Sequence, residues 1–189
     1  GNRSGVASDL TTNEAYDKVS RSNVMEVEAQ IDTLFSRIVK AMNDVYCPNV
    51  ESKDAITSVD GTVYPAGTKI LDADNCARGV DGKLPPRELF TRVGVDRYTE
   101  VTGTDGKTYY IYNEEDPNNT STMYSIGSVS ISSDLKRQIT LMPAYTANGA
   151  VDYDFGHRLA NAWNVKDMVL SPDDQEPCTF EEYYDKVVS

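Results

Sequence analysis

The longest regular pattern of apolar residues lies between residues 23 and 47. Apolar side chains recur there at alternating intervals of three and four positions. This spacing places them along one face of an α-helix. The residues of this stripe are Val24, Val27, Ile31, Leu34, Ile38, Ala41 and Val45. The pattern therefore predicts one long amphipathic helix.

The ends of this helix and a second apolar stripe are also visible. Asn23 can cap the first turn, with Glu26 reaching back to the amide of the cap, and Pro48 cannot continue a helix. The second stripe consists of Phe35, Val39, Met42 and Tyr46. Because two stripes form a wide apolar face, the helix needs packing partners. It is either one helix of a globular core or a helix of an elongated bundle within an assembly.

Between residues 51 and 131 the pattern changes to short β-like runs separated by turn residues. Two Asp-Gly pairs, at 60–61 and 105–106, each lie between two such runs. Asp-Gly in this position is a strong hairpin signal, because we expect a turn with positive φ at both central residues. The sequence therefore predicts two β-hairpins joined by a long irregular connection.

Two shorter helices are predicted after residue 131. Residues 132–139 have the pattern of a short helix capped by Ser132 or Ser133. Asp154 can cap a second helix. The apolar face of that second helix carries Phe155, Leu159 and Trp163.

The last segment predicts a third helix, which begins with a capping box formed by Thr179 and Glu182. Its apolar residues recur at helical spacing, so we expect this helix to pack against the long one. The residues expected at this helix-packing or subunit interface are Val24, Val27, Ile31, Leu34, Ile38 and Val45 on the long helix, and Phe180, Tyr183, Tyr184 and Val187 on the last one.

The order of these elements predicts an α+β fold. Residues 14–50 and 132–189 would form a helical bundle domain, in which the long amphipathic helix packs with the shorter C-terminal helices. Residues 51–131 would form a β-rich hairpin insert that projects from one end of the bundle. Residues 1–13 are small and polar, which predicts a flexible lead-in.

The net charge of the chain limits the classes of binding partner that we expect. Among 189 residues, 30 are acidic and 18 are basic, which gives a net charge of −12. Nucleic acids and anionic membrane surfaces both attract clustered Lys and Arg, so we expect neither as a partner. No apolar run approaches the roughly twenty residues of a membrane span, and the start of the chain lacks the basic and apolar regions of a secretory signal peptide.

No motif for catalysis or for a cofactor is present in the sequence. His157 is the only histidine, and neither a G-x-S-x-G motif nor a glycine-rich phosphate loop occurs. Residues 72–75 resemble the start of a calcium loop, but Lys83 stands where that loop requires a glutamate. Acidic runs such as 114–116 are typical of solvated loops. We therefore expect no enzyme activity, no cofactor and no metal site.

The three cysteines give no clear framework. Cys47, Cys76 and Cys178 are odd in number and widely separated, which predicts neither a metal site nor a set of disulfides. A single bridge between Cys47 and Cys76 stays open as an alternative.

Three segments carry a resemblance to a known family. The first is VMEVEAQIDTLFSRIVKAMNDVYCPN (24–49), the second is YSIGSVSISSDLKRQITLMPA (124–144), and the third combines DYDFGHRLANAWN (152–164) with CTFEEYYDKVVS (178–189). They resemble, in order, the long helix, the later strand-then-helix segment and the C-terminal helical region of the flagellar hook-associated proteins that join hook to filament. TFEEYYDKVV is the most specific match, whereas Ser132-Ser133 replaces the usual Asn-Pro. The second junction protein and the hook protein, which are sister axial proteins, stay open.

The resemblance implies a structural protein without catalysis or cofactor. Its copies would pack in a ring, with the hook protein on one side and the filament-side junction protein on the other. The family is extracellular and is exported through the flagellar secretion channel without a cleavable signal peptide. Gly1 in place of a methionine, and a last helix without a C-cap, lead us to expect a middle-to-late fragment that lacks the terminal axial helices.

Two other functions stay open from the residues alone. A secreted or surface binding module would use the β-rich insert to recognise a glycan or a protein, which requires an aromatic-lined concavity around Tyr109, Tyr110 and Tyr112. An enzyme would require convergent carboxylates or a partner for His157 in a cleft.

Overall fold

The computed structural model of the chain describes residues 23–170 and 176–189. Within them the fold combines helices with antiparallel β-sheets, which is an α+β composition. The helices are α2 (Asn23–Tyr46), α3 (Ser133–Arg137), α4 (Phe155–Trp163) and α5 (Phe180–Val188), with 3₁₀ turns η1 (Thr120–Thr122) and η2 (Ile139–Leu141). The predicted lead-in, residues 1–13, lies outside the described part of the chain.

The strands are short and all pair antiparallel. They are β1 (Asn49–Glu51), β2 (Ile56–Thr57), β3 (Val63–Tyr64), β4 (Lys69–Leu71), β5 (Phe90–Arg92), β6 (Tyr98–Thr102), β7 (Thr108–Tyr112) and β8 (Val129–Ile131). They form a four-stranded sheet in the order β1-β4-β7-β6 and two ribbons, β2-β3 and β5-β8. In the β5-β8 ribbon Phe90 lies opposite Ile131.

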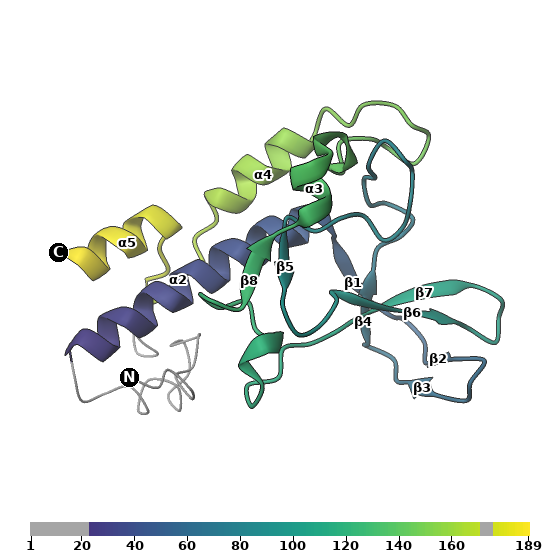
Figure 1. Ribbon diagram of the computed structural model, residues 1–189, viewed down its shortest axis with the longest axis horizontal. Helices are drawn as coiled ribbons and strands as arrows, with labels where there is room; N and C mark the ends of the chain where they lie inside the picture. Colours follow the sequence, from purple (N-terminus) through teal and green to yellow (C-terminus); the bar gives the residue numbers. More distant parts are fainter. Residues whose placement is uncertain (1–22, 171–175) are drawn as a thin grey trace.

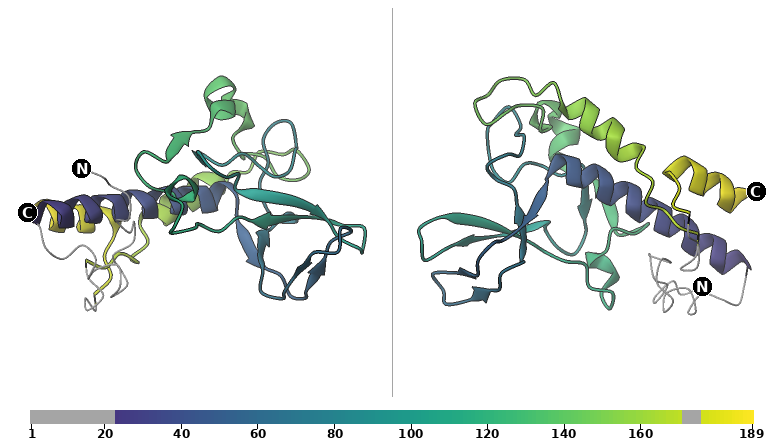
Figure 2. Two further views of the ribbon diagram at one scale, coloured as in Figure 1. Left: turned by 60° about the horizontal axis from the view of Figure 1, so that its bottom comes forward. Right: turned by 180° about the vertical axis from the view of Figure 1, so that it is seen from behind.

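Helix α2 is the longest element and forms an arm of the molecule. Its 24 residues extend about 36 Å at the usual helical rise. Helices α4 and α5 follow one another along this arm, and both contact α2 (Figure 1). The first turn of α2 and the last turn of α5 lie at the same end of the molecule, whereas the four-stranded sheet lies at the other end (Figure 2).

Both predicted hairpins are confirmed, but the predicted turn type is wrong. Gly61 and Gly106 have φ values of 91° and 78°, and no other residue type among those described has a positive φ. The Gly61 amide donates to the Ser58 carbonyl, and the Ser58 amide donates to the Thr62 carbonyl. This pattern is a tight turn followed by a glycine bulge, which needs only one left-handed residue.

The two hairpins meet near their tips. The Val59 amide donates to the Thr102 carbonyl at 2.9 Å, and the Thr104 amide donates to the Thr57 carbonyl at 2.8 Å. A small core lies between them and contains Ile56, Val101 and Ile111. The hairpins therefore form one β unit rather than two independent projections (Figure 1).

A second core closes the end of α2 that faces the sheet. Its buried members are Tyr46, Cys47, Leu71, Cys76, Leu135, Leu141 and Phe155, contributed by α2, the β4 region, α3, η2 and α4. The rings of Tyr46 and Phe155 meet edge to face with centroids 5.2 Å apart. Burial of these side chains holds the helices and the sheet together at this point.

The helix caps agree with the sequence at two positions and differ at a third. Thr179 and Glu182 form the predicted capping box of α5, and Ser132 caps α3. Asp154, the predicted cap of α4, makes no side-chain capping hydrogen bond because it has αR backbone geometry. Asp152 instead accepts a hydrogen bond from the Asp154 amide and pairs with Arg158.

Candidate functional site

The predicted helix-packing residues converge around the middle of α2. Leu34, Phe180 and Tyr183 are buried in one cluster together with Met168 and Cys178, and Ile38 and Val187 pack at its margin. The ring of Trp163 at the end of α4 meets Phe180 at 5.6 Å. The structure therefore brings this part of α2 against α5 and the end of α4.

Other predicted interface residues lie elsewhere. Val45 packs against the core at the sheet end of α2, and Ile31 is half-buried. Val27 and Tyr184 are 43% and 50% exposed. The side chain of Val24 lies outside the described residues. Because α5 has only nine residues, it covers less of the α2 stripe than the sequence pattern extends.

A polar face of α2, absent from the predicted interface, is also buried. The nearly inaccessible residues Thr33, Ser36 and Asn43 lie on it. Asp32 on the same helix accepts a hydrogen bond from the Ile126 amide at 2.8 Å. Asp32 and Asn43 thus attach this face of the helix to backbone groups of the 113–127 segment and of β5.

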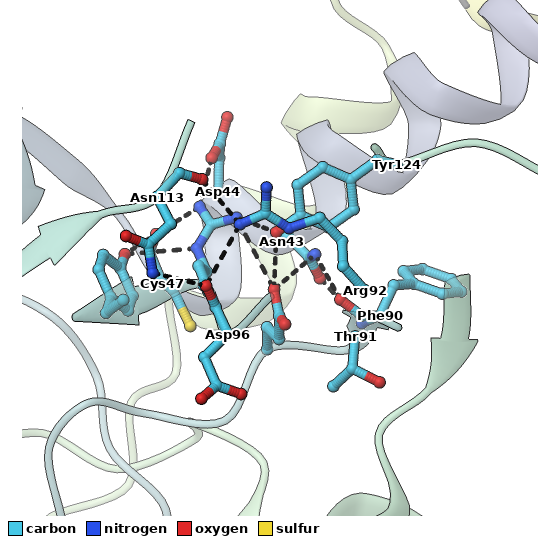
Figure 3. A network of polar contacts seen from close by, with 12 residues as sticks. Asn43, Asp44, Cys47, Phe90, Thr91, Arg92, Asp96, Asn113 and Tyr124 are labelled. Atoms are coloured by element: carbon cyan, nitrogen blue, oxygen red, sulfur yellow. Dashed lines mark hydrogen bonds and ion pairs between the residues drawn. The ribbon is translucent and has the colours of Figure 1, made fainter. Parts of the chain in front are cut away.

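The buried polar contacts are densest at the C-terminal end of α2, where Arg97 lies. Arg97 immediately precedes β6 and is only 5% exposed. Its guanidinium contacts the Asp44 carboxylate at 2.6 Å, donates to the Cys47 carbonyl at 3.0 Å and donates to the Tyr124 hydroxyl at 3.2 Å (Figure 3). One side chain of the β region thus binds the last turn of α2, the carbonyl of the residue that follows α2 and the 113–127 segment.

Glu88 completes this network, which we call the joint and define as Asn43, Asp44, Glu88, Arg92, Arg97 and Tyr124. The Glu88 carboxylate accepts hydrogen bonds from Asn43 Nδ2 at 3.1 Å and from the Tyr124 hydroxyl at 2.9 Å. It also lies 4.0 Å from the Arg97 guanidinium. Burial raises the pKa of Glu88, and it also raises the pKa of the Tyr124 hydroxyl.

Arg92 attaches the 113–127 segment to β5. It donates to the Thr122 carbonyl at 2.9 Å and to the Asn113 carbonyl at 2.8 Å. Its guanidinium lies 4.6 Å from the centre of the Tyr124 ring. The planar fork of arginine suits several carbonyl acceptors and an aromatic face at once.

The acidic run at 114–116 is more ordered than a solvated loop. Glu115 forms an ion pair with Lys40 of α2 and accepts a hydrogen bond from the Tyr124 amide at 2.9 Å. Glu114 pairs with Lys69 of β4 at 3.4 Å. The expectation of a purely solvated loop is therefore wrong for Glu115, because Lys40 and the Tyr124 amide both bind its carboxylate.

A polar groove of about 440 Å³ lies beside the joint. It is lined by Lys40, Asp44, Pro48, Asn49, Lys69, Tyr112, Glu114 and Glu115. Its charged side chains pair with one another or with Arg97. The groove therefore presents neutralised charges rather than an excess of either sign.

The tyrosines of β7 do not line a shared concavity. Tyr109 packs with the hairpin core and donates to Asp105 at 2.6 Å. Tyr110 packs on the core at the end of α2. Tyr112 lies under the cations of Lys69, Arg92 and Arg97. Successive side chains of a strand point to opposite faces, which separates Tyr109 from the other two.

His157 is exposed on α4. Within 23–170 and 176–189, no group of His, Cys, Asp and Glu has the arrangement of a metal site. In the same residues no helix has both the length and the hydropathy needed to cross a membrane. What the joint provides is a buried network of hydrogen bonds and ion pairs between the arm and the β region.

No sequence pattern identified the residues of the joint. Arg97, Glu88 and Tyr124 lie outside every periodic pattern, and each resembles an ordinary polar residue of a strand or loop. Asn43 is a polar residue within a helix whose prediction depended on apolar spacing. Only the contacts across roughly 27 to 53 positions of sequence identify these residues as a group.

Comparisons with known proteins give no family for this chain. No protein-family model matches it. Neither the curated proteins nor the solved structures contain a match. The function is therefore argued from the geometry of the arm and the joint together with the sequence resemblance.

Proposed function

We propose that this chain is a structural part of the bacterial flagellum that joins hook to filament by subunit packing, without catalysis or cofactor. The proposal begins from the resemblance of residues 24–49, 124–144, 152–164 and 178–189 to the hook-associated proteins. In it, 14–50 and 132–189 are a helical bundle domain, and 51–131 is a β-rich insert. The observation that supports this proposal best is the long helix α2 of the arm and its attachment to the β region through the joint.

The joint supports a mechanical role. Arg97 and Glu88 are buried and contact groups from α2 and from the 113–127 segment. Breaking such a network exposes buried charge, so bending between arm and β region is opposed strongly. A protein that transmits torque between two tubes needs this resistance.

The far end of the arm supports packing with neighbouring subunits. Met25 and Val27 on α2, and Tyr184 and Val188 on α5, are exposed apolar side chains. The start of α2 and the end of α5 lie together at that end (Figure 2). In the proposal, neighbouring subunits cover these side chains, and the β region faces outward.

The remaining parts of the proposal follow from the family. The partners are further copies in a ring, the hook protein and the filament-side junction protein, with neither nucleic acid nor membrane. The location is extracellular, after export through the flagellar channel. The net charge of −12 agrees with a solvent-facing role for much of the surface.

The test is capture of hook protein by this protein, with a matched pair of variants. Val27→Glu changes an exposed residue of the arm, and Val63→Glu changes an exposed residue of a hairpin tip. We expect stable capture of purified hook protein by the wild-type protein. Val27→Glu should reduce this capture at least tenfold, whereas Val63→Glu should leave it unchanged. Unchanged thermal unfolding of both variants shows that folding is not the cause.

The opposite pattern would overturn the proposal. Absence of hook-protein capture, combined with binding to a glycan or to another surface protein that Val63→Glu abolishes, would favour the surface binding module. In that case the β region, rather than the arm, would be the functional surface.

A further inference from the structure

The end of α2 and the segment after β4 bring two thiols into one buried cluster. Cys47 is 0% exposed and Cys76 is 2% exposed, and both belong to the core at the sheet end of α2. Burial is the main cause of the raised pKa of Cys47, and the neighbouring Cys76 thiol raises it further. The two cysteines therefore lie in the same buried core, although 28 residues separate them in the sequence.

The backbone explains why they meet. Asn49 lies opposite Leu71 in the β1-β4 pair, and the Asp72 amide extends this ladder by donating to the Pro48 carbonyl at 2.9 Å. The chain then turns, and the Cys76 amide donates to the Asp72 carbonyl at 2.9 Å. The turn returns Cys76 toward the strand that begins after Cys47.

The third cysteine, Cys178, serves as a control for the proposed pair. Cys178 is also buried, but it lies in the cluster between α2 and α5, where its thiol donates to the Met168 carbonyl at 3.3 Å. None of the three cysteines is in a disulfide in the structure. The chain thus contains one pair of neighbouring thiols and one separate thiol of similar burial.

We propose that Cys47 and Cys76 form an intramolecular disulfide when the protein is in an oxidising environment. The proposal deepens the proposed function in one respect, because the extracellular location supplies such an environment. The chemistry itself depends only on the two thiols and a small-molecule disulfide as oxidant.

The reaction is a thiol–disulfide exchange in two steps. Both thiols are buried in the folded chain, so the exchange takes place while the chain refolds. One of the two thiols loses its proton to solvent, and its thiolate attacks one sulfur of oxidised glutathione, which releases one glutathione thiolate. As folding brings the two residues together, the second thiol loses its proton and its thiolate attacks the protein sulfur of the mixed disulfide, which releases the second glutathione as a thiolate. Two thiols are oxidised and one disulfide is reduced.

The bond would reinforce the joint. The Cys47 carbonyl already accepts hydrogen bonds from Arg97 and from the Tyr98 hydroxyl. A disulfide from the same residue would enclose the whole β1–β4 segment in a covalent loop. Cross-links of this length stabilise a fold mainly by restricting the unfolded chain.

The experiment counts thiols by mass after oxidative refolding. The full chain is unfolded and reduced, refolded in a buffer of reduced and oxidised glutathione, denatured again, and treated with N-ethylmaleimide. We expect one N-ethylmaleimide adduct per chain. After the mass of this adduct is subtracted, the mass of the chain should be two hydrogens below that of the fully reduced protein. Cys178→Ser should then give no adduct, whereas Cys47→Ser and Cys76→Ser should each keep two.

Three results would overturn the inference: three adducts on the refolded chain, a stable glutathione mixed disulfide, or a covalent dimer. Peptide mapping assigns the bond, and the oxidised protein should unfold at a temperature several degrees higher than the reduced one. If the thiol count does not show the disulfide, the hook-protein capture experiment still tests the proposed function. If hook protein is not captured, the thiol count still tests the disulfide.

Discussion

Asn43 of α2 and the backbone of Phe90 in β5 are joined by two hydrogen bonds. Asn43 Nδ2 donates to the Phe90 carbonyl at 2.8 Å, and the Phe90 amide donates to Asn43 Oδ1 at 2.9 Å. The side-chain amide therefore occupies the place that a neighbouring strand would take. It satisfies the free edge of β5 and fixes the helix against the β5-β8 ribbon.

Replacing Asn43 by Ala should destabilise the protein by about 1–3 kcal/mol, because the Phe90 amide and carbonyl lose their partner away from water. Urea unfolding measures this loss. Asn161→Ala on the exposed surface of α4 is the matched control and should change the free energy of unfolding by less than about 0.5 kcal/mol. Equal effects of the two variants would mean that water replaces Asn43 at the edge of β5.

Arg97→Met should cost about 3–5 kcal/mol, since it leaves the buried Glu88 carboxylate without its nearest cation. Adding Glu88→Gln should recover part of this loss, because the uncompensated charge is then removed. Denaturant unfolding of the two single variants and the double variant gives the coupling energy. Strictly additive effects would show that Arg97 acts through its carbonyl and tyrosine contacts alone.

Leu34→Ala should cost about 2–5 kcal/mol if the α2–α5 cluster is a real core, because Leu34 is buried there. Val27→Ala, about two helical turns closer to the start of α2 than Leu34 and at a side chain that is 43% exposed, should change stability by less than about 0.5 kcal/mol. Thermal unfolding of both variants decides this. A small effect at Leu34 would indicate that the stripe is completed by another subunit.

Asp152 should make stability depend on pH in the acid range. The hydrogen bond from Arg158 lowers the pKa of Asp152, and the two groups are 2.6 Å apart. A lowered native pKa stabilises the fold above the unfolded value of about 4, and this contribution disappears as pH falls through the native value. Asp152→Asn should therefore cost about 0.5–1 kcal/mol at pH 7 and nothing near pH 2.

Urea unfolding at several pH values between 2 and 7 checks this. Asp154→Asn is the control, because Asp154 makes no side-chain capping bond. A difference between wild type and Asp152→Asn that persists at pH 2 would contradict the assignment of the shift to this pair.

The elements with local signals were predictable from sequence. The 24 residues of α2 follow from the spacing of apolar side chains, and the start of α5 follows from Thr179 and Glu182. The two Asp-Gly pairs located both hairpins. The physical reason is that helix periodicity, capping and turns depend on groups within about four residues of one another.

The face of α2 that is buried, and the joint itself, were decided by the tertiary structure. Leu34 meets Tyr183, whereas Val27 of the same stripe stays exposed and the polar Thr33 and Asn43 are enclosed. Whether a polar side chain can be buried depends on partners that only the folded chain supplies, such as Phe90, which is 47 residues from Asn43. The sequence by itself determined which segments are helix and hairpin, and long-range satisfaction of polar groups determined how they are joined.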